Sequence, residues 1–240
     1  MAQVWVIGFL ATFVGVGIGG GIATAIYRFK KSMSTIYAVC AGLLLGLLSF
    51  EIVPEALMLG DWLMFGVGFA VGLIVYEVIH RRFHQHPLIR KDPYKNHSIR
   101  TGLFLALVIS IHNLPMGIVL GTSDHAEFSF AFLQAMILHT IPEGMILFMP
   151  LILAGVRFNV LFLISIVIAV PVAIGAFIGD LIGVQNSGIM ALLISSTVGM
   201  IYMVTVKEIL VESVRQSSNM YGGLVACAAF LVMGAYLWWL

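Results

Sequence analysis

Eight long apolar runs constrain the fold of this 240-residue chain more than any other feature. A helix needs about 20 mostly apolar residues to cross the hydrocarbon core of a membrane. Backbone groups cannot stay unpaired in lipid, so such runs are expected to be helical. The sequence therefore predicts an all-α polytopic membrane bundle, one transmembrane domain over residues 1–240, with spans at 3–27, 36–58, 62–79, 99–121, 128–153, 159–182, 188–211 and 221–239.

Composition excludes a soluble globular enzyme. Hydrophobic residues other than glycine make up 61% of the chain, and charged residues only 10%. Soluble domains carry about 45–50% apolar residues even with glycine counted. The net charge of +1 gives no reason to expect a nucleic-acid partner.

Basic residues indicate the orientation of the spans. They follow the first span, surround the connection between the third and fourth, and flank two later spans, all on one predicted side. Cytoplasmic loops carry an excess of such residues, so we expect both termini outside a prokaryotic cytoplasmic membrane. The first run has its positive charges after it and is interpreted as a span, not a signal peptide. The basic residues are Arg28, Lys30, Lys31, Arg81, Arg82, Arg90, Lys91, Lys95, Arg100, Arg157, Lys207 and Arg215.

The one sizeable connection is a basic cytoplasmic loop at residues 80–98, which contains His80, His84, His86 and His97. A basic loop beside a membrane fixes topology and contacts anionic lipid. A tract rich in histidine can instead capture metal ions weakly. Both interpretations fit this segment.

Two pairs of segments resemble each other within the chain. Residues 111–120 and 138–147 share His, Pro and Gly at matched positions, and residues 42–55 and 199–212 share Gly, a Glu-Ile pair and a later Glu. In each pair the two spans cross the membrane in opposite directions. The pattern predicts inverted repeats in a 3+2+3 arrangement, which is typical of secondary transporters that bind substrate at the midplane.

Polar residues stand at bilayer depth in the fourth and fifth spans. An ionised side chain there costs about 2.5–3.5 kcal/mol on insertion scales. His112 and Met116 are four residues apart, as are His139 and Glu143, so each pair lies on one helix face. Together they offer two imidazoles, a carboxylate and a thioether for a four-coordinate ion site, with Asn113 alongside. A satisfied structural network is the alternative.

Prolines strengthen the case for a cavity. Pro115 and Pro142 each lack an N–H and displace the carbonyl four residues earlier. Unpaired carbonyls at this depth are tolerated where they line a cavity. We therefore expect both helices to bend at the depth of the histidines.

The donor set favours Zn²⁺ as the transported substrate, because imidazole suits it and a thioether adds softness. Fe²⁺, Mn²⁺, Cd²⁺ and Co²⁺ stay open, whereas Mg²⁺ and Ca²⁺ prefer oxygen ligands. Met116 could instead be packing, which would leave three protein ligands and water. One carboxylate does not neutralise a divalent ion, so further acids are expected along the pathway. The candidate acids are Glu51 and Glu208, although Glu208 could equally lie at the inner interface beside Lys207. Glu51 and Glu55, with Asp124, His125 and Glu127, could concentrate cations at an entrance, although a solvated loop explains Asp124, His125 and Glu127 equally well.

The motifs His-Asn-x-Pro-x-Gly at 112–117 and His-x-x-Pro-Glu-Gly at 139–144 resemble the metal-binding helices of the ZIP family of divalent metal transporters. Residues 50–56 and 200–210 are similar to that family's second and seventh helices. The resemblance implies eight spans, outward termini, a histidine-bearing loop between the third and fourth spans, and metal entry into the cytoplasm.

Three positions depart from the family pattern. Relatives usually carry Glu at Met116, often an acid at Thr140, and a Glu at Val170 before the proline of the sixth span. Those acids normally build a second metal position. The resemblance therefore implies a mononuclear site made by His112, Met116, His139 and Glu143, with Asn113 beside it.

Two other functions are compatible with these residues. A non-transporting relative would sense metal or scaffold partners, and a membrane-embedded zinc hydrolase would use an open water position on the metal. The expected partners are a divalent metal ion and membrane lipid, and a homodimer is left open.

Glycine runs in two spans are interpreted as close helix packing. They are Gly15, Gly17, Gly19, Gly20 and Gly21 in the first span and Gly175, Gly179 and Gly183 in the sixth.

Overall fold

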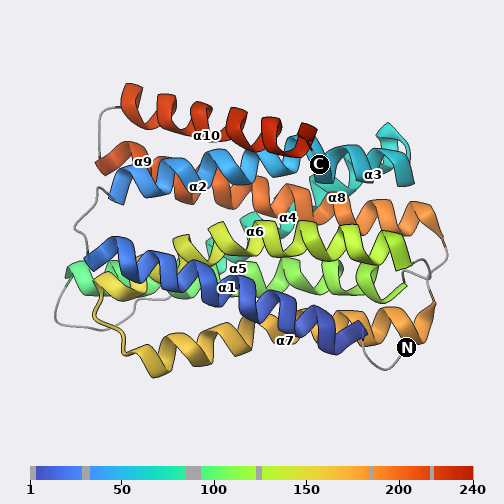
Figure 1. Cartoon of the computed structure of the whole chain (residues 1–240), viewed down its shortest axis with the longest axis horizontal. Coiled ribbons are helices and arrows are strands. Elements are labelled where there is room, and N and C mark those ends of the chain that lie inside the picture. Colours follow the sequence, from blue (N-terminus) through green and yellow to red (C-terminus); the bar gives the residue numbers. More distant parts are fainter. Residues whose placement is uncertain are drawn as a thin grey trace.

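The computed structural model describes residues 4–28, 33–84, 93–122, 126–183, 186–216 and 219–239. Within these ranges the chain is helical apart from short turns and contains no strand, which confirms the all-α prediction (Figure 1). The helices are α1 (Val4–Arg28), α2 (Met33–Leu47), η1 (Leu48–Ile52), α3 (Val53–Leu59), α4 (Trp62–His84), α5 (Pro93–Thr122), α6 (Ala126–Leu153), α7 (Phe158–Ile182), α8 (Ser187–Met203), η2 (Val204–Leu210), α9 (Val211–Gln216) and α10 (Asn219–Trp239).

Eight helical segments in the described ranges are long and apolar enough to cross a membrane, as the sequence predicts. Two of them are composite, since α2, η1 and α3 form one span and α8, η2 and α9 form another. The helices also enter the predicted 80–98 loop from both sides. Residues 80–84 continue α4, residues 93–98 begin α5, and residues 85–92 lie outside the described part.

The spans form two groups. In Figure 1, α1, α5, α6 and α7 lie together in the lower part, and α2, α8 and α10 lie above them. Within the first group α1 packs on α6 and α5 packs on α7; within the second, α2 packs on α10 and α4 on α8. Contacts of α5 with α8 and of α2 with α6 join the groups. The predicted repeat would exchange α1 with α7, α6 with α5, α2 with α8 and α10 with α4. The α1–α6 pair then corresponds to the α7–α5 pair, and the α2–α10 pair to the α8–α4 pair. The inverted repeat itself stays a prediction.

Glycines let the helices of the first group approach closely. A Cβ on Gly19 of α1 would collide with the backbone of α6, and one on Gly175 of α7 would collide with the backbone of α5. A Cβ on Gly179 would also meet the backbone of α5, and one on Gly15 or Gly20 would meet the side chain of Thr140 or Phe148 of α6. The prediction is therefore confirmed for these five glycines.

For three glycines the packing prediction is wrong. Gly17 and Gly21 have open space where a Cβ would stand, because both lie on the outer face of α1. Gly183 ends α7 in a left-handed conformation at φ 58°, which glycine adopts without strain. It acts as a helix cap and makes no close contact.

Two π-helical turns, η1 and η2, interrupt the composite spans. They fall inside the two segments, 42–55 and 199–212, that resemble each other in sequence. Glu51 lies in η1 and Glu208 in η2. Both acids therefore stand where the backbone departs from regular α geometry. Such π turns inside longer helices are frequent at functional sites. Helices α5 and α6 continue through Pro115 and Pro142, and a bend there stays a prediction.

The glycine contact between α1 and α6 predicts a stability difference along one helix. Gly19→Ala should lower the free energy of unfolding by roughly 1–3 kcal/mol, because the added methyl meets backbone that cannot move aside. Gly21→Ala is the matched control, since its methyl enters open space on the same helix. Thermal unfolding of both variants in detergent measures this, and equal midpoints would contradict the packing described.

Candidate metal centre

Helices α5 and α6 bring three potential metal ligands together. His112, His139 and Glu143 each offer one ligand atom, and these atoms all lie within 4.8 Å of one another. Their side chains are 1%, 1% and 2% exposed. The i, i+4 spacing puts His139 and Glu143 on one face of α6, and α5 presents His112 to that face. The geometry is that of a small, buried, three-ligand cluster.

The hydrogen bond of His112 fixes its tautomer. Its Nδ1 lies 3.1 Å from the carbonyl oxygen of Val108. A carbonyl only accepts hydrogen bonds, so Nδ1 carries the proton in a neutral imidazole. The lone pair on Nε2 then points into the cluster. This is the arrangement in which a histidine binds a metal through Nε2 while its other nitrogen is held by a backbone carbonyl.

Two acceptors face each other in the cluster. Nε2 of His112 lies 3.1 Å from Oε1 of Glu143, at an angle that does not make a hydrogen bond. Among the described residues neither Nε2 of His112 nor either carboxylate oxygen of Glu143 has a hydrogen-bond partner. A buried charge without compensation is strongly destabilising. A cation between these atoms would satisfy all of them at once.

Asn113 links α5 to α7 through a hydrogen bond. Its Nδ2 donates a hydrogen bond to the carbonyl oxygen of Ile168 on α7, at 3.2 Å. The side chain is fully buried, and its Oδ1 has no hydrogen-bond partner in the part of the chain that the structure describes. An amide oxygen held in this way can contribute a negative dipole to a nearby cation site.

Comparison with known proteins identifies the family. The sequence model of the family described as ZIP zinc transporter matches residues 79–239, which include both helices of the cluster. The chain belongs to the ZIP family. A zinc transporter, ZupT of Corynebacterium aurimucosum, is 30% identical over 125 residues, covering 45% of this chain and 47% of that protein. The chain thus spans about half the length of this curated relative.

The three positions at which this ZIP protein departs from the family pattern provide no carboxylate. Thr140 is buried and its hydroxyl donates to Ile137 in its own helix, and Val170 is 39% exposed on the outer surface of α7. Met116 is buried in an apolar cluster that also contains Leu48 and Ile52. No fourth His, Cys, Asp or Glu of the described residues joins the cluster. The mononuclear site and ligation by Met116 both stay predictions.

Among the described residues, no other candidate joins the cluster. Glu51 and Glu55 are partly buried in η1 and α3, and Oε2 of Glu51 has no hydrogen-bond partner within the described ranges. His86, Asp124 and His125 fall outside the described residues, as does the side chain of His84. Their proposed roles stay predictions.

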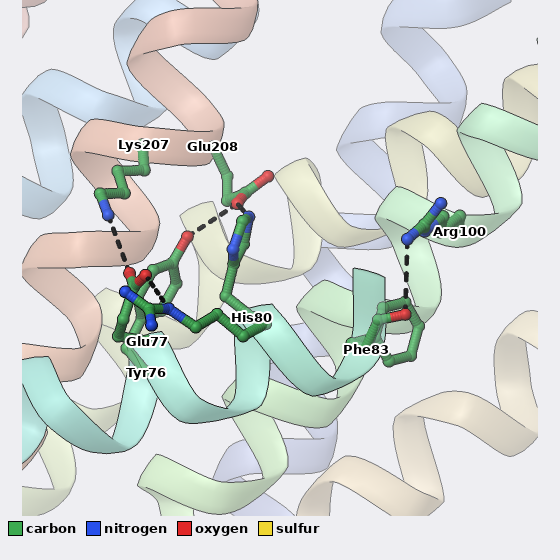
Figure 2. Close-up of polar contacts among 8 residues, drawn as sticks. Tyr76, Glu77, His80, Phe83, Arg100, Lys207 and Glu208 are labelled. Carbon is green, nitrogen blue, oxygen red and sulfur yellow. Dashed lines mark hydrogen bonds and ion pairs between the residues drawn. The ribbon is translucent and has the colours of Figure 1, made fainter. Parts of the chain in front are cut away.

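Glu208 is engaged at the end of the bundle that carries most of the basic residues. Tyr76 donates its hydroxyl proton to Oε1 of Glu208 at 2.7 Å, and Nε2 of His80 lies 3.5 Å from the same oxygen (Figure 2). Lys207 does not pair with Glu208, because its ammonium group lies 3.0 Å from Glu77. These contacts tie α4 to η2.

A pocket of about 180 Å³ opens beside these contacts of His80 and Glu208. His80, His97, Glu208 and Glu212 are among its lining residues, so two of the loop histidines share one cavity with two acids. Sequence reasoning missed Tyr76 and Glu77. The signal for Glu77 was an acid within the apolar run 62–79, whereas Tyr76 offered none.

The Zn²⁺ affinity of two variants should distinguish the role of the buried cluster from that of the pocket. His139→Ala removes an imidazole ligand and should lower Zn²⁺ affinity by more than the roughly 10–100-fold that changes outside the ligand shell cost. Glu208→Gln should leave that affinity unchanged, because the carboxylate belongs to the contacts of Tyr76 and His80. Calorimetric titration of the purified variants measures both, and unchanged affinity in His139→Ala would contradict the site.

Met116→Leu tests the fourth ligand. The substitution conserves volume and should cost less than about 1.5 kcal/mol of stability. If the thioether binds metal, affinity should fall more for the soft ion Cd²⁺ than for Mn²⁺. The control is Met136→Leu, which is equally buried and whose sulfur is contacted by the Thr12 hydroxyl. Equal effects of the two variants on both ions would assign Met116 to packing.

Proposed function

We propose that this ZIP-family chain transports divalent transition-metal ions, Zn²⁺ first, through a mononuclear midplane site on α5 and α6. The observation that carries the proposal is the buried lone pair of His112 facing the carboxylate of Glu143. Such an arrangement is unfavourable without a cation and favourable with one. The family's description and the printed name of the relative support zinc, and Fe²⁺, Mn²⁺, Cd²⁺ and Co²⁺ are further substrates to test.

Burial of the cluster sets a requirement on transport. His112, His139 and Glu143 are at most 2% exposed, so an ion there contacts no bulk water. Entry and release each require the surrounding helices to move. Glycines of α1 lie against α6, with Gly19 facing its backbone and Gly15 facing the short side chain of Thr140. Sliding along this interface is one way in which the site could open.

Acids on both sides of the cluster suggest the pathway. Glu51 and Glu55 lie on the composite span formed by α2, η1 and α3, and we assign them to the entrance. Glu208 and the histidines of the pocket lie at the basic end, and we assign them to release. With both termini outside, as the basic residues favour, this gives movement toward the cytoplasm.

Uptake of radioactive zinc into proteoliposomes tests transport. Glu143→Gln keeps the shape of the side chain but removes the charge that balances the ion, so uptake should fall to the level of empty vesicles. Ser195→Ala is the control, since Ser195 is equally buried but donates only to Ala191 in its own helix. Uptake that persists in Glu143→Gln would overturn the proposed site.

A non-transporting metal sensor is the second candidate, because Met116, Thr140 and Val170 replace acids of the family pattern. The same vesicles distinguish it. A wild-type protein that binds zinc with one ion per chain but moves none would favour the sensor over the transporter.

A further inference from the structure

A narrow apolar groove runs between α1 and α7 in the half of the bundle that ends at Arg28. Its volume is about 190 Å³. Phe148 of α6 packs against Gly20 and forms the floor, and the rings of Phe13 and Phe162, 5.5 Å apart, meet edge to face across the groove. Gly17 and Gly21 line one wall with no side chain, so the groove is open along α1.

The groove offers no polar group to an occupant. Its two hydroxyl residues are bonded within their own helices: Thr24 donates to Gly20 at 2.8 Å, and Ser165 donates to Leu161 at 3.2 Å. The remaining lining residues are aromatic, aliphatic or glycine. A water or a metal ion would find no partner there, whereas a hydrocarbon chain would bury apolar surface.

The length of the groove matches one leaflet. From Phe13 to Thr24 the lining residues cover eleven steps of helix, which is about 16 Å at 1.5 Å per residue. This is close to half of the roughly 30 Å hydrocarbon core of a bilayer. One acyl chain of a lipid in the adjacent leaflet would therefore fill it from the interface to the bilayer centre.

Positive charge marks the interfacial end of the groove. Arg157 directly precedes Phe158, which lines the groove, and Arg28 ends α1 one turn beyond Thr24. Arg157 is exposed, and its guanidinium makes no ion pair within the described part of the chain. It also lines a second apolar hollow, of about 320 Å³, on the other side of α7. The cation thus stands between two surfaces suited to acyl chains.

We propose that the groove between α1 and α7 binds an acyl chain of an anionic phospholipid whose headgroup is held by Arg157. The inference depends on the chain spanning a membrane and is independent of the proposed transport. It also gives the open glycines a role, since Gly17 and Gly21 provide the space that the chain occupies. The occupant would support α7, the helix whose Ile168 carbonyl holds Asn113.

Native mass spectrometry of the full-length protein in neutral detergent tests this, with phosphatidylglycerol and phosphatidylcholine of identical chains as probes. The wild type should retain phosphatidylglycerol in preference to phosphatidylcholine. Gly17→Leu adds a side chain at a position whose Cβ would meet nothing within 4 Å, and by occupying the groove it should lower retention of phosphatidylglycerol severalfold. Gly66→Leu is its control, because Gly66 has equally open space on α4, away from the groove. The thermal-unfolding midpoint of each variant in the same detergent shows that it has folded.

A second pair of variants isolates the headgroup. Arg157→Gln should abolish the preference for phosphatidylglycerol, whereas Arg82→Gln, at an exposed arginine of α4, should keep it. The proposal is overturned if the wild type does not distinguish the two lipids or if Gly17→Leu retains phosphatidylglycerol as the wild type does. It is likewise overturned if Arg157→Gln keeps the wild-type preference.

Discussion

The fold is organised around a carboxylate and an imidazole lone pair that face each other at 3.1 Å inside an apolar bundle. Water does not reach Glu143, and its charge has no hydrogen-bond donor among the described residues. Such a contact requires a proton or a metal cation between the two groups, and the proposed function assigns a metal ion to it. The neighbouring contacts hold it in place: the Val108 carbonyl sets the tautomer of His112, and the Gly19 contact keeps α6 against α1.

The proposed site contains a single carboxylate, and this affects how tightly it would hold an ion. One carboxylate against a divalent ion leaves a net positive charge in a medium of low dielectric, where it is poorly screened. In the proposed site, the amide oxygen of Asn113 and the sulfur of Met116 would provide dipole and polarisability but no charge. A site of this kind should hold its ion less tightly than one with several acids, and a weakly held ion is released more readily. Glu51 and Glu208 do not join the cluster, and the proposed pathway assigns them roles before and after it.

The sequence revealed what depends on composition and helical periodicity. Eight spans follow from the length of apolar runs, and the pairing of His139 with Glu143 follows from one turn of helix. Contacts that depend on which helix packs against a residue could not be predicted from the sequence. Gly19 and Gly21 look alike in sequence, yet one meets the backbone of α6 and the other meets nothing. The bond from Tyr76 to Glu208 had no local signal either, because it joins two segments far apart in the sequence.

X-ray absorption spectroscopy at the zinc edge of the loaded protein tests the central claim most directly. A single ion held by His112, His139 and Glu143 should show two imidazole nitrogens at about 2.0–2.1 Å together with carboxylate oxygen. Replacing both histidines by alanine should remove the imidazole signal. A shell of oxygen alone, or a second zinc close to the first, would contradict a mononuclear site built on these residues.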